Sequence, residues 1–157
     1  MKIVRIRSGG QTGVDRAALD AARELGLPIA GWCPKNGRAE DHEDPADDWL
    51  LKQYPELRET NYAGFSQRTV LNIWDADATI IISPGDGKVS PGTQLTIDEA
   101  KKLKKPYFLL RDENVTEVLK WLNKNFKGDI EVNFAGPRAS SSPGVYDIAK
   151  EIIKKII

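Results

Sequence analysis

Two short stretches of this chain, Ala78–Ser83 and Tyr107–Leu110, are apolar almost without interruption. Such continuous runs are typical of strands buried on both faces, as in a parallel sheet. Further apolar runs occur at Ile3–Ile6, Pro28–Trp32 and Ile130–Phe134. The last of these alternates apolar with polar residues, so we expect it at a sheet edge or with one face in water.

Segments with apolar residues at helical spacing lie between these runs. We expect helices at Val14–Leu25, Tyr62–Trp74, Thr93–Lys104, from Asn114 through Leu122, and from about Gly144 to Ile157. The expected core contacts of these helices include Leu25, Trp74 and Ile148. Strands that alternate with helices predict an α/β fold: a Rossmann-like open, mostly parallel sheet of about five strands with helices on both faces.

The alternation is interrupted by the segment Pro34–Thr60, which is rich in proline and charge. A loop of this length in a compact domain is usually functional or disordered, so we expect one of the two here. The chain has 157 residues, of which 40% are hydrophobic. That length suggests one domain, and we interpret residues 1–157 as a single Rossmann-like ligand-binding domain.

The composition disfavours several classes of partner. Lysine and arginine number 23, as do aspartate and glutamate, so the net charge is zero and a nucleic-acid-coating surface is not expected. Cys33 and His42 are the only residues of their kinds, so we expect no disulfide and no zinc site. Cys33 itself fits a small buried residue better than a ligand for a soft metal. No apolar run resembles a signal peptide or a membrane span, so we expect a cytoplasmic protein without a membrane partner.

Glycine-rich segments follow two of the expected strands. In open α/β sheets, ligands bind outside the carboxyl ends of the strands, which is where Ser8–Gly13 and Pro84–Thr93 fall. Glycines permit close approach to the backbone, and a helix N-terminus offers free N–H groups, so both loops favour a phosphate or another oxyanion. For the first loop, a tight turn without a ligand is the alternative. Its pattern is neither a P-loop nor G-x-G-x-x-G, which disfavours ATP hydrolysis and ordinary dinucleotide binding.

A third candidate segment follows the fifth apolar run. Arg138 carries a guanidinium fork suited to oxyanions, and Ser140–Ser142 could bind a ligand or cap the last helix. Near the first loop, Asp15 could favour the helix dipole or bind a ligand hydroxyl or amine. Arg16 could reach a phosphate or pair with an acid on another element.

Eight stretches, spread in order along nearly the whole chain, resemble the molybdenum carrier family. They are S-G-G-Q-T-G-V-D-R-A-A-L-D-A-A, G-W-C-P-K, R-A-E-D, R-E-T, Y-A-G-F-S-Q-R-T, D-A-D-A-T-I-I-I, P-G-T and F-A-G-P-R-A-S. The family is a branch of the Rossmann-like superfamily that includes the Lonely Guy-type phosphoribohydrolases. The resemblance implies a Rossmann-like fold, a nucleotide or molybdopterin-type ligand and frequent oligomers.

The phosphoribohydrolase relatives carry P-G-G-x-G-T-x-x-E, with an Arg-Lys pair on the preceding helix. Arg68 matches that arginine, but Thr69 replaces the lysine and Thr96 stands at the position of the acid. A threonine cannot act as a carboxylate acid or base, so the binding half of the motif is kept and the catalytic half is not. A displaced acid at Glu99, one turn further along the helix, is the alternative.

These observations favour a binding or carrier protein for a phosphorylated small molecule, either the molybdenum cofactor (molybdopterin) or a nucleotide. The predicted ligand-binding residues are Gly9, Gly10, Gln11, Thr12, Gly13, Asp15, Arg16, Lys35, Arg68, Gly92, Thr93 and Arg138. We expect a homo-oligomer and no metal ligands among these residues. The sequence identifies no catalytic residue.

Two other functions stay open. One is a hydrolase of nucleotide N-glycosidic or phosphate bonds, of the phosphoribohydrolase type. Its possible acids are Asp15, Glu40, Asp41, Glu59 and Glu99. The other is a regulatory domain that senses a nucleotide and responds by changing its oligomer.

Overall fold

A computed structural model describes residues 1–157, and it confirms the α/β, Rossmann-like fold. The strands are β1 (Lys2–Arg7), β2 (Ile29–Ala30), β3 (Trp32–Cys33), β4 (Arg58–Glu59), β5 (Ala78–Ile82), β6 (Tyr107–Leu110) and β7 (Asp129–Ala135). The helices are α1 (Val14–Glu24), the 3₁₀ turn η1 (Lys35–Gly37), α2 (Trp49–Gln53), α3 (Phe65–Asp75), α4 (Pro91–Lys102), α5 (Thr116–Asn125) and α6 (Val145–Ile156). Five strands form one sheet in the order β2-β1-β7-β5-β6, and β3 pairs with β4 in a small second sheet.

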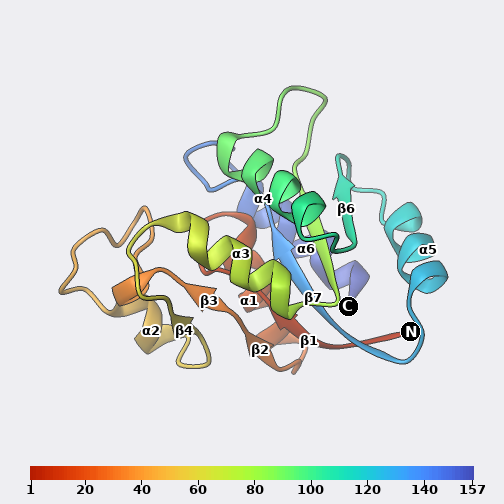
Figure 1. Cartoon of the computed structure of the whole chain (residues 1–157). Helices are drawn as coiled ribbons and strands as arrows, with labels where there is room; N and C mark the ends of the chain where they lie inside the picture. The colour runs from red at the N-terminus through yellow and green to blue at the C-terminus, as the bar shows by residue number, and fades with distance from the viewer.

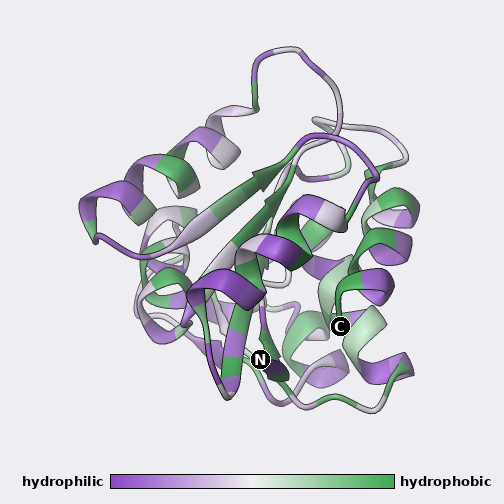
Figure 2. Ribbon diagram, turned by 90° about the vertical axis from the view of Figure 1, so that its right-hand side faces the viewer, coloured by the Kyte–Doolittle hydropathy of each residue, from purple (hydrophilic) through white to green (hydrophobic).

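Every pair of neighbouring strands in both sheets is parallel. Helices α3 and α4 pack side by side on one face of the main sheet, and α1 and α6 pack together on the other (Figure 1). Figure 2 shows hydrophobic residues gathered along the central strands, while the flanking helices alternate between hydrophobic and hydrophilic residues. The predicted sheet with helices on both faces is therefore confirmed.

Strand β7 lies in the centre of the sheet, between β1 and β5, so the expected edge position of Ile130–Phe134 is wrong. Its polar residues are paired with neighbouring strands. Glu131 accepts from Arg5 at 2.7 Å and from Arg7 at 2.7 Å, and Asn133 donates to the Thr79 hydroxyl at 3.3 Å. Cross-strand pairing offsets the free-energy cost of burying polar groups, so a central strand can carry them. The alternating pattern therefore does not require an edge position.

The two continuous apolar runs have different environments. Strand β5 is buried along its whole length, as the continuous pattern predicts. Strand β6 is an edge strand, and Tyr107–Leu109 are only half-buried, so the expectation of burial on both faces is wrong there. The Phe108 ring finds its partner in Trp121 of α5, with ring centroids 5.6 Å apart.

All five predicted helices are present, with ends that differ by a few residues. Some of their expected core contacts are wrong: Leu25, Trp74 and Ile148 are exposed. Leu25 is the C-cap of α1, where the backbone leaves the helix, so its side chain does not lie on the buried face. The Trp74 indole, 58% exposed, lies on the surface with the Lys105 ammonium 5.8 Å from its ring.

The segment Pro34–Thr60 is ordered and carries η1, α2 and β4, so a long irregular loop is the wrong description. Three of its side chains, Leu50, Tyr54 and Leu57, belong to the hydrophobic core. The Tyr54 hydroxyl also donates to Asp20 of α1 at 2.6 Å. These contacts fix the segment against α1, below the loop that follows β1. None of the helices has both the length and the apolar character that crossing a membrane requires.

Candidate functional site

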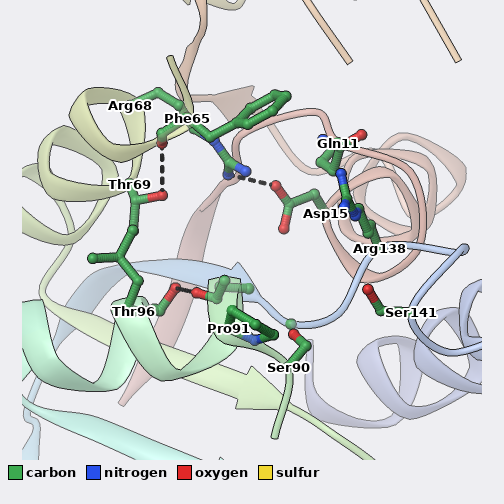
Figure 3. A pocket seen from close by; sticks show the side chains of 14 residues that line it. Gln11, Asp15, Phe65, Arg68, Thr69, Ser90, Pro91, Thr96, Arg138 and Ser141 are labelled. Carbon is green, nitrogen blue, oxygen red and sulfur yellow. Dashed lines mark hydrogen bonds and ion pairs between the residues drawn. The ribbon is translucent and has the colours of Figure 1, made fainter. Parts of the chain in front are cut away.

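A cavity of about 240 Å³ opens where the β5 and β7 strands end, between α1, α3 and α4 (Figure 3). It is lined by Gln11, Asp15, Phe65, Arg68, Thr69, Ser90, Pro91, Gly92, Leu95, Thr96, Ala135, Gly136, Arg138 and Ser141. Its volume lies somewhat below the usual range for ligand pockets, about 300–1,000 Å³. The cavity therefore suits a small molecule or part of a larger one.

Asp15 and Arg68 form a nearly buried ion pair on one wall of the cavity. Arg68 Nη1 donates to Asp15 Oδ2 at 2.7 Å, and the two side chains are 14% and 4% exposed respectively. Burial raises the pKa of the Asp15 carboxyl, and the Arg68 guanidinium and the Gln11 backbone N–H act against that rise. The Nε of Arg68 is buried and has no hydrogen-bond partner in the protein. The pair thus contains one buried donor that the fold leaves unsatisfied.

Arg138 lies on another wall of the same cavity and has a weaker carboxylate partner. Its Nε is 3.4 Å from Glu40 Oε2, and its side chain is 48% exposed. Glu40 also accepts from the Ser140 backbone N–H at 3.1 Å, from the Ser140 hydroxyl at 2.5 Å and from the Thr12 hydroxyl. Partial burial alone would raise the pKa of Glu40, but the hydrogen bonds from Ser140 and Thr12, with Arg138, outweigh it and lower that pKa.

In Figure 3 the N-terminus of α4, with Ser90 and Pro91, lies at the bottom of the cavity, next to Ser141 and across from Arg68. Ser90 caps this helix: its hydroxyl accepts from the Thr93 N–H at 3.3 Å, and its carbonyl accepts from the Gln94 N–H at 2.9 Å. Pro91 has no N–H, so the Gly92 N–H is the donor of the first turn that remains. Together with the positive end of the helix dipole, this donor favours a negatively charged group.

Two threonines make the cavity wall between α3 and α4 uncharged. The Thr69 hydroxyl donates to the Phe65 carbonyl at 3.0 Å, and the Thr96 hydroxyl donates to the Gly92 carbonyl at 3.1 Å (Figure 3). Both hydroxyl protons are therefore used within their own helices. Glu99, considered as a displaced acid, does not line the cavity and lies 3.8 Å from the Lys102 ammonium.

Of the predicted ligand-binding residues, the cavity brings together Gln11, Asp15, Arg68, Gly92 and Arg138. The others lie outside its lining: Gly9, Gly10, Thr12, Gly13, Arg16, Lys35 and Thr93. Lys35 is exposed and Thr93 is buried in the first turn of α4. Their role in binding stays a prediction.

Arg16, next to Asp15 in sequence, is directed away from the cavity. Its guanidinium donates to Asp41 at 2.5 Å and to the Gly10 carbonyl at 3.0 Å, and it lies 5.0 Å from the centre of the Trp49 ring. Adjacent residues on a helix do not share a face, so Asp15 and Arg16 have separate partners. Of the two roles considered for Arg16, the structure favours pairing with an acid on another element.

Some N–H groups near the start of α1 have acceptors within the protein. The Thr12 N–H donates to the Gln11 side chain at 3.0 Å, the Val14 N–H to the Pro137 carbonyl at 3.3 Å, and the Arg16 N–H to the Gln11 carbonyl at 3.0 Å. The N–H groups of Gly9, Gly10 and Gly13 have no acceptor in the protein, but neighbouring protein atoms crowd all three glycines, so this loop mainly holds one wall of the cavity in shape. The start of α4 is the more open of the two helix N-termini.

Several residues that line the cavity are of types that do not indicate a binding site in sequence. The helical pattern of Tyr62–Trp74 predicts Phe65 as a core contact, but Phe65 precedes Arg68 by about one helical turn, shares its face and lines the cavity. Leu95 and Pro91 likewise look like packing residues in sequence. Glu40 lies 100 residues from Ser140, so nothing local predicts that it bridges the segments after β1 and β7.

Cys33 and His42 do not form a pair. The Cys33 thiol is buried and lies 3.6 Å from the Arg58 carbonyl, and burial raises its pKa to about 11. The His42 ring stacks on Trp49 at 4.3 Å and bonds to Asp47 at 2.5 Å. No group of three or more histidine, cysteine, aspartate or glutamate side chains is arranged to hold a metal ion.

The fold and the cavity define a Rossmann-like protein of the SLOG class. The chain belongs to the circularly permutated YpsA SLOG family, whose model matches residues 6–157. It is also similar to the crystal structure of a protein from Syntrophus aciditrophicus SB named "Putative molybdenum carrier protein", with 33% sequence identity and a TM-score of 0.81. That similarity covers 99% of this chain and 95% of the other, which confirms the resemblance seen in sequence. A comparison with curated proteins gave no match.

Proposed function

We propose that this chain binds one phosphorylated small molecule, a nucleotide or the molybdenum cofactor, and releases it unchanged. The observation that carries the proposal is the pairing of the open α4 N-terminus with Arg138 across one cavity. The Gly92 N–H, the helix dipole and a half-exposed guanidinium are the groups that recognise a phosphate. A ligand phosphate would replace the Glu40 carboxylate as the partner of Arg138.

The absence of a carboxylate at position 96 supports binding over cleavage. Thr96 stands where the phosphoribohydrolase relatives carry their acid, and its hydroxyl is already bonded to Gly92. Thr69 stands in place of their lysine and is likewise bonded within its own helix. The related structure from Syntrophus aciditrophicus bears a carrier's name, which agrees with this proposal.

The cavity residues also fit the organic part of a molybdenum cofactor. Gly92 and Arg138 would hold its phosphate, and Asp15 with Arg68 would face its ring system. The cofactor would supply the metal through its own dithiolene sulfurs, so the protein needs no cluster of metal ligands. The role of this chain would be to hold the phosphate and the ring and to shield them from water.

A nucleotide hydrolase is the second candidate, and one observation favours it. Asp15 is a buried carboxyl within the cavity whose pKa is raised by burial, the property expected of a general acid or base. Release of free base or phosphate from a nucleotide, abolished by Arg68→Ala, would establish this function. Tight binding without release would exclude it.

Isothermal titration calorimetry tests the proposal with nucleoside monophosphates, their unphosphorylated nucleosides and a phosphorylated pterin. We expect at least one phosphorylated compound to bind at least about tenfold more tightly than its unphosphorylated form. Arg138→Ala should remove most of that difference because it removes a charged phosphate partner. Arg23→Ala is the matched control: it removes a surface arginine paired with Glu56, away from the cavity, and should leave affinity unchanged. No heat with any phosphorylated compound would contradict the proposal.

We propose in addition that residues 1–157 act as one ligand-binding domain in the cytoplasm, as a homo-oligomer. Light scattering with and without ligand separates a passive carrier from a nucleotide-sensing domain. A carrier keeps its mass, whereas a sensing domain that signals through assembly changes it.

A further inference from the structure

Asp15 and Arg68 both have hydrogen-bonding capacity that the protein does not use. A carboxylate accepts about four hydrogen bonds, and the only one made to the Asp15 carboxylate within the protein comes from Arg68. Arg68 uses Nη1 for Asp15, and neither its buried Nε nor its Nη2, which is not buried, has a partner in the protein. A ligand that satisfies both must present N–H donors to the carboxylate and an acceptor oxygen to the guanidinium, side by side.

We propose that this pair recognises the 2-amino-4-oxopyrimidine edge that guanine and pterin rings share, an inference that rests on the proposed function. In both rings an amino group and an adjacent ring N–H lie next to each other, and a carbonyl oxygen follows. The two nitrogens donate to Asp15 and the carbonyl oxygen accepts from Arg68. The nucleotide and the molybdopterin-type ligand are therefore alternatives with one chemistry in common.

The remainder of this wall suits a flat ring. Phe65 and Leu95 line the cavity, and the Phe65 ring lies 6.0 Å from the Arg68 guanidinium carbon (Figure 3). An aromatic ring and an aliphatic side chain give a planar heterocycle apolar surface to stack on. Gly92 lies at the start of α4, whereas Asp15 and Arg68 lie on α1 and α3, so ring and phosphate would bind at different parts of the cavity.

The same geometry disfavours adenine. Its Watson–Crick edge has an acceptor nitrogen where guanine has an N–H donor, so it would place a lone pair against the Asp15 carboxylate. Unpaired acceptors in a buried site are costly, and they provide selectivity against the wrong base. A ribose diol also combines donor and acceptor hydroxyls, and the experiment separates this possibility from the ring edge.

Calorimetry of the full chain with GMP, IMP, 2′-deoxy-GMP, AMP and phosphorylated hydroxymethylpterin tests the inference. IMP lacks only the 2-amino group, so we expect it to bind about tenfold more weakly than GMP, or about 1.4 kcal/mol. AMP should bind more weakly than GMP, and 2′-deoxy-GMP should bind as GMP does. Binding of the pterin alone, or of GMP alone, would support the edge and identify its source.

Two variants show whether Asp15 causes the selectivity. Asp15→Asn should abolish the difference between GMP and IMP because its amide presents a donor to the ring N–H groups. Asp41→Asn is the matched control, since it removes the carboxylate that pairs with Arg16 outside the cavity and should keep the difference. The wild-type ligand series decides the matter even if Asp15→Asn does not fold.

Equal affinity for GMP and IMP would overturn the inference, and so would tighter binding of AMP. If 2′-deoxy-GMP then bound more weakly than GMP, the pair would hold the ribose instead. In both cases phosphorylated compounds still bind, so the proposed function survives. Failure of every phosphorylated compound to bind would overturn both.

Discussion

The two glycine-rich loops look alike in sequence but have opposite surroundings in the structure. In Ser8–Gly13, a Cβ at Gly9 would be 2.0 Å from Arg68 Nη1, and one at Gly13 would be 2.4 Å from the Pro137 carbonyl. In the loop before α4, a Cβ at Gly87 or Gly92 would meet nothing within 4 Å. The first loop needs glycine because protein atoms occupy the space, whereas the second leaves that space open.

This difference assigns the loops separate roles. The first loop is packed between the segment after β7, α3 and the Pro34–Thr60 segment, and it fixes Asp15 and Arg68 in place. The second loop rises above the sheet (Figure 1) and brings the start of α4 to the cavity. Glycine content alone therefore does not distinguish a rigid support from an open binding loop, and substitutions in the two loops should separate them.

Gly13→Ala should have the largest effect. Gly13 has a φ of 77°, and its added methyl would meet backbone atoms that cannot move aside. Backbone strain and overpacking together should cost about 3 kcal/mol or more in the free energy of unfolding, measured by urea denaturation. The matched variant Gly87→Ala should change it by less than about 0.5 kcal/mol. Equal effects of the two would remove the distinction between the loops.

Gly9→Ala should weaken ligand binding while the protein stays folded. Its methyl meets the end of the flexible Arg68 side chain, which can move but then loses Asp15. We expect affinity for the best phosphorylated ligand to fall at least about tenfold, because a buried charged hydrogen bond is lost. Calorimetry and circular dichroism on the same sample measure affinity and folding. Unchanged affinity would show that Arg68 does not contribute to the site.

Glu40→Gln should have a smaller, pH-dependent effect, because Glu40 ties the first loop to Ser140. The pKa of Glu40 is lowered from its usual 4.5, so the carboxylate stabilises the fold above that pH. This stabilisation is lost as pH falls through the lower folded-state pKa. At pH 7 the variant should be about 1 kcal/mol less stable in urea denaturation, since the group is partly exposed. The difference should shrink as pH falls through the folded-state pKa; a difference that stays constant with pH would contradict this role.

Gly92→Ala should have the smallest effect on stability, in the opposite direction. Alanine is favoured over glycine in a helix by about 0.5–1 kcal/mol, so the free energy of unfolding should rise by up to that amount. The new methyl stands in open cavity space beside the phosphate subsite, so affinity should fall several-fold. A stabilised variant with undiminished affinity would show that the ligand does not approach this helix.

Sequence reasoning found the fold because its main signals are local. The continuous run of β5 and the helical spacing of α1 and α4 depend on neighbouring residues alone. Strand β7 was misplaced because the partners of Glu131 on β1 lie 124 and 126 residues away. The site shows the same limit: Asp15 and Arg68 were each predicted, but their ion pair joins residues 53 positions apart. Local patterns also cannot show in which loop neighbouring protein atoms occupy the space around the glycines.

Native mass spectrometry after incubation with GMP and with phosphorylated hydroxymethylpterin tests the central claim most directly. We predict a complex of one ligand per chain, with the ligand mass intact after prolonged incubation, and a much weaker signal for Arg138→Ala. No complex with either compound, or recovery of free base or phosphate in place of the intact ligand, would contradict a protein that binds without cleaving.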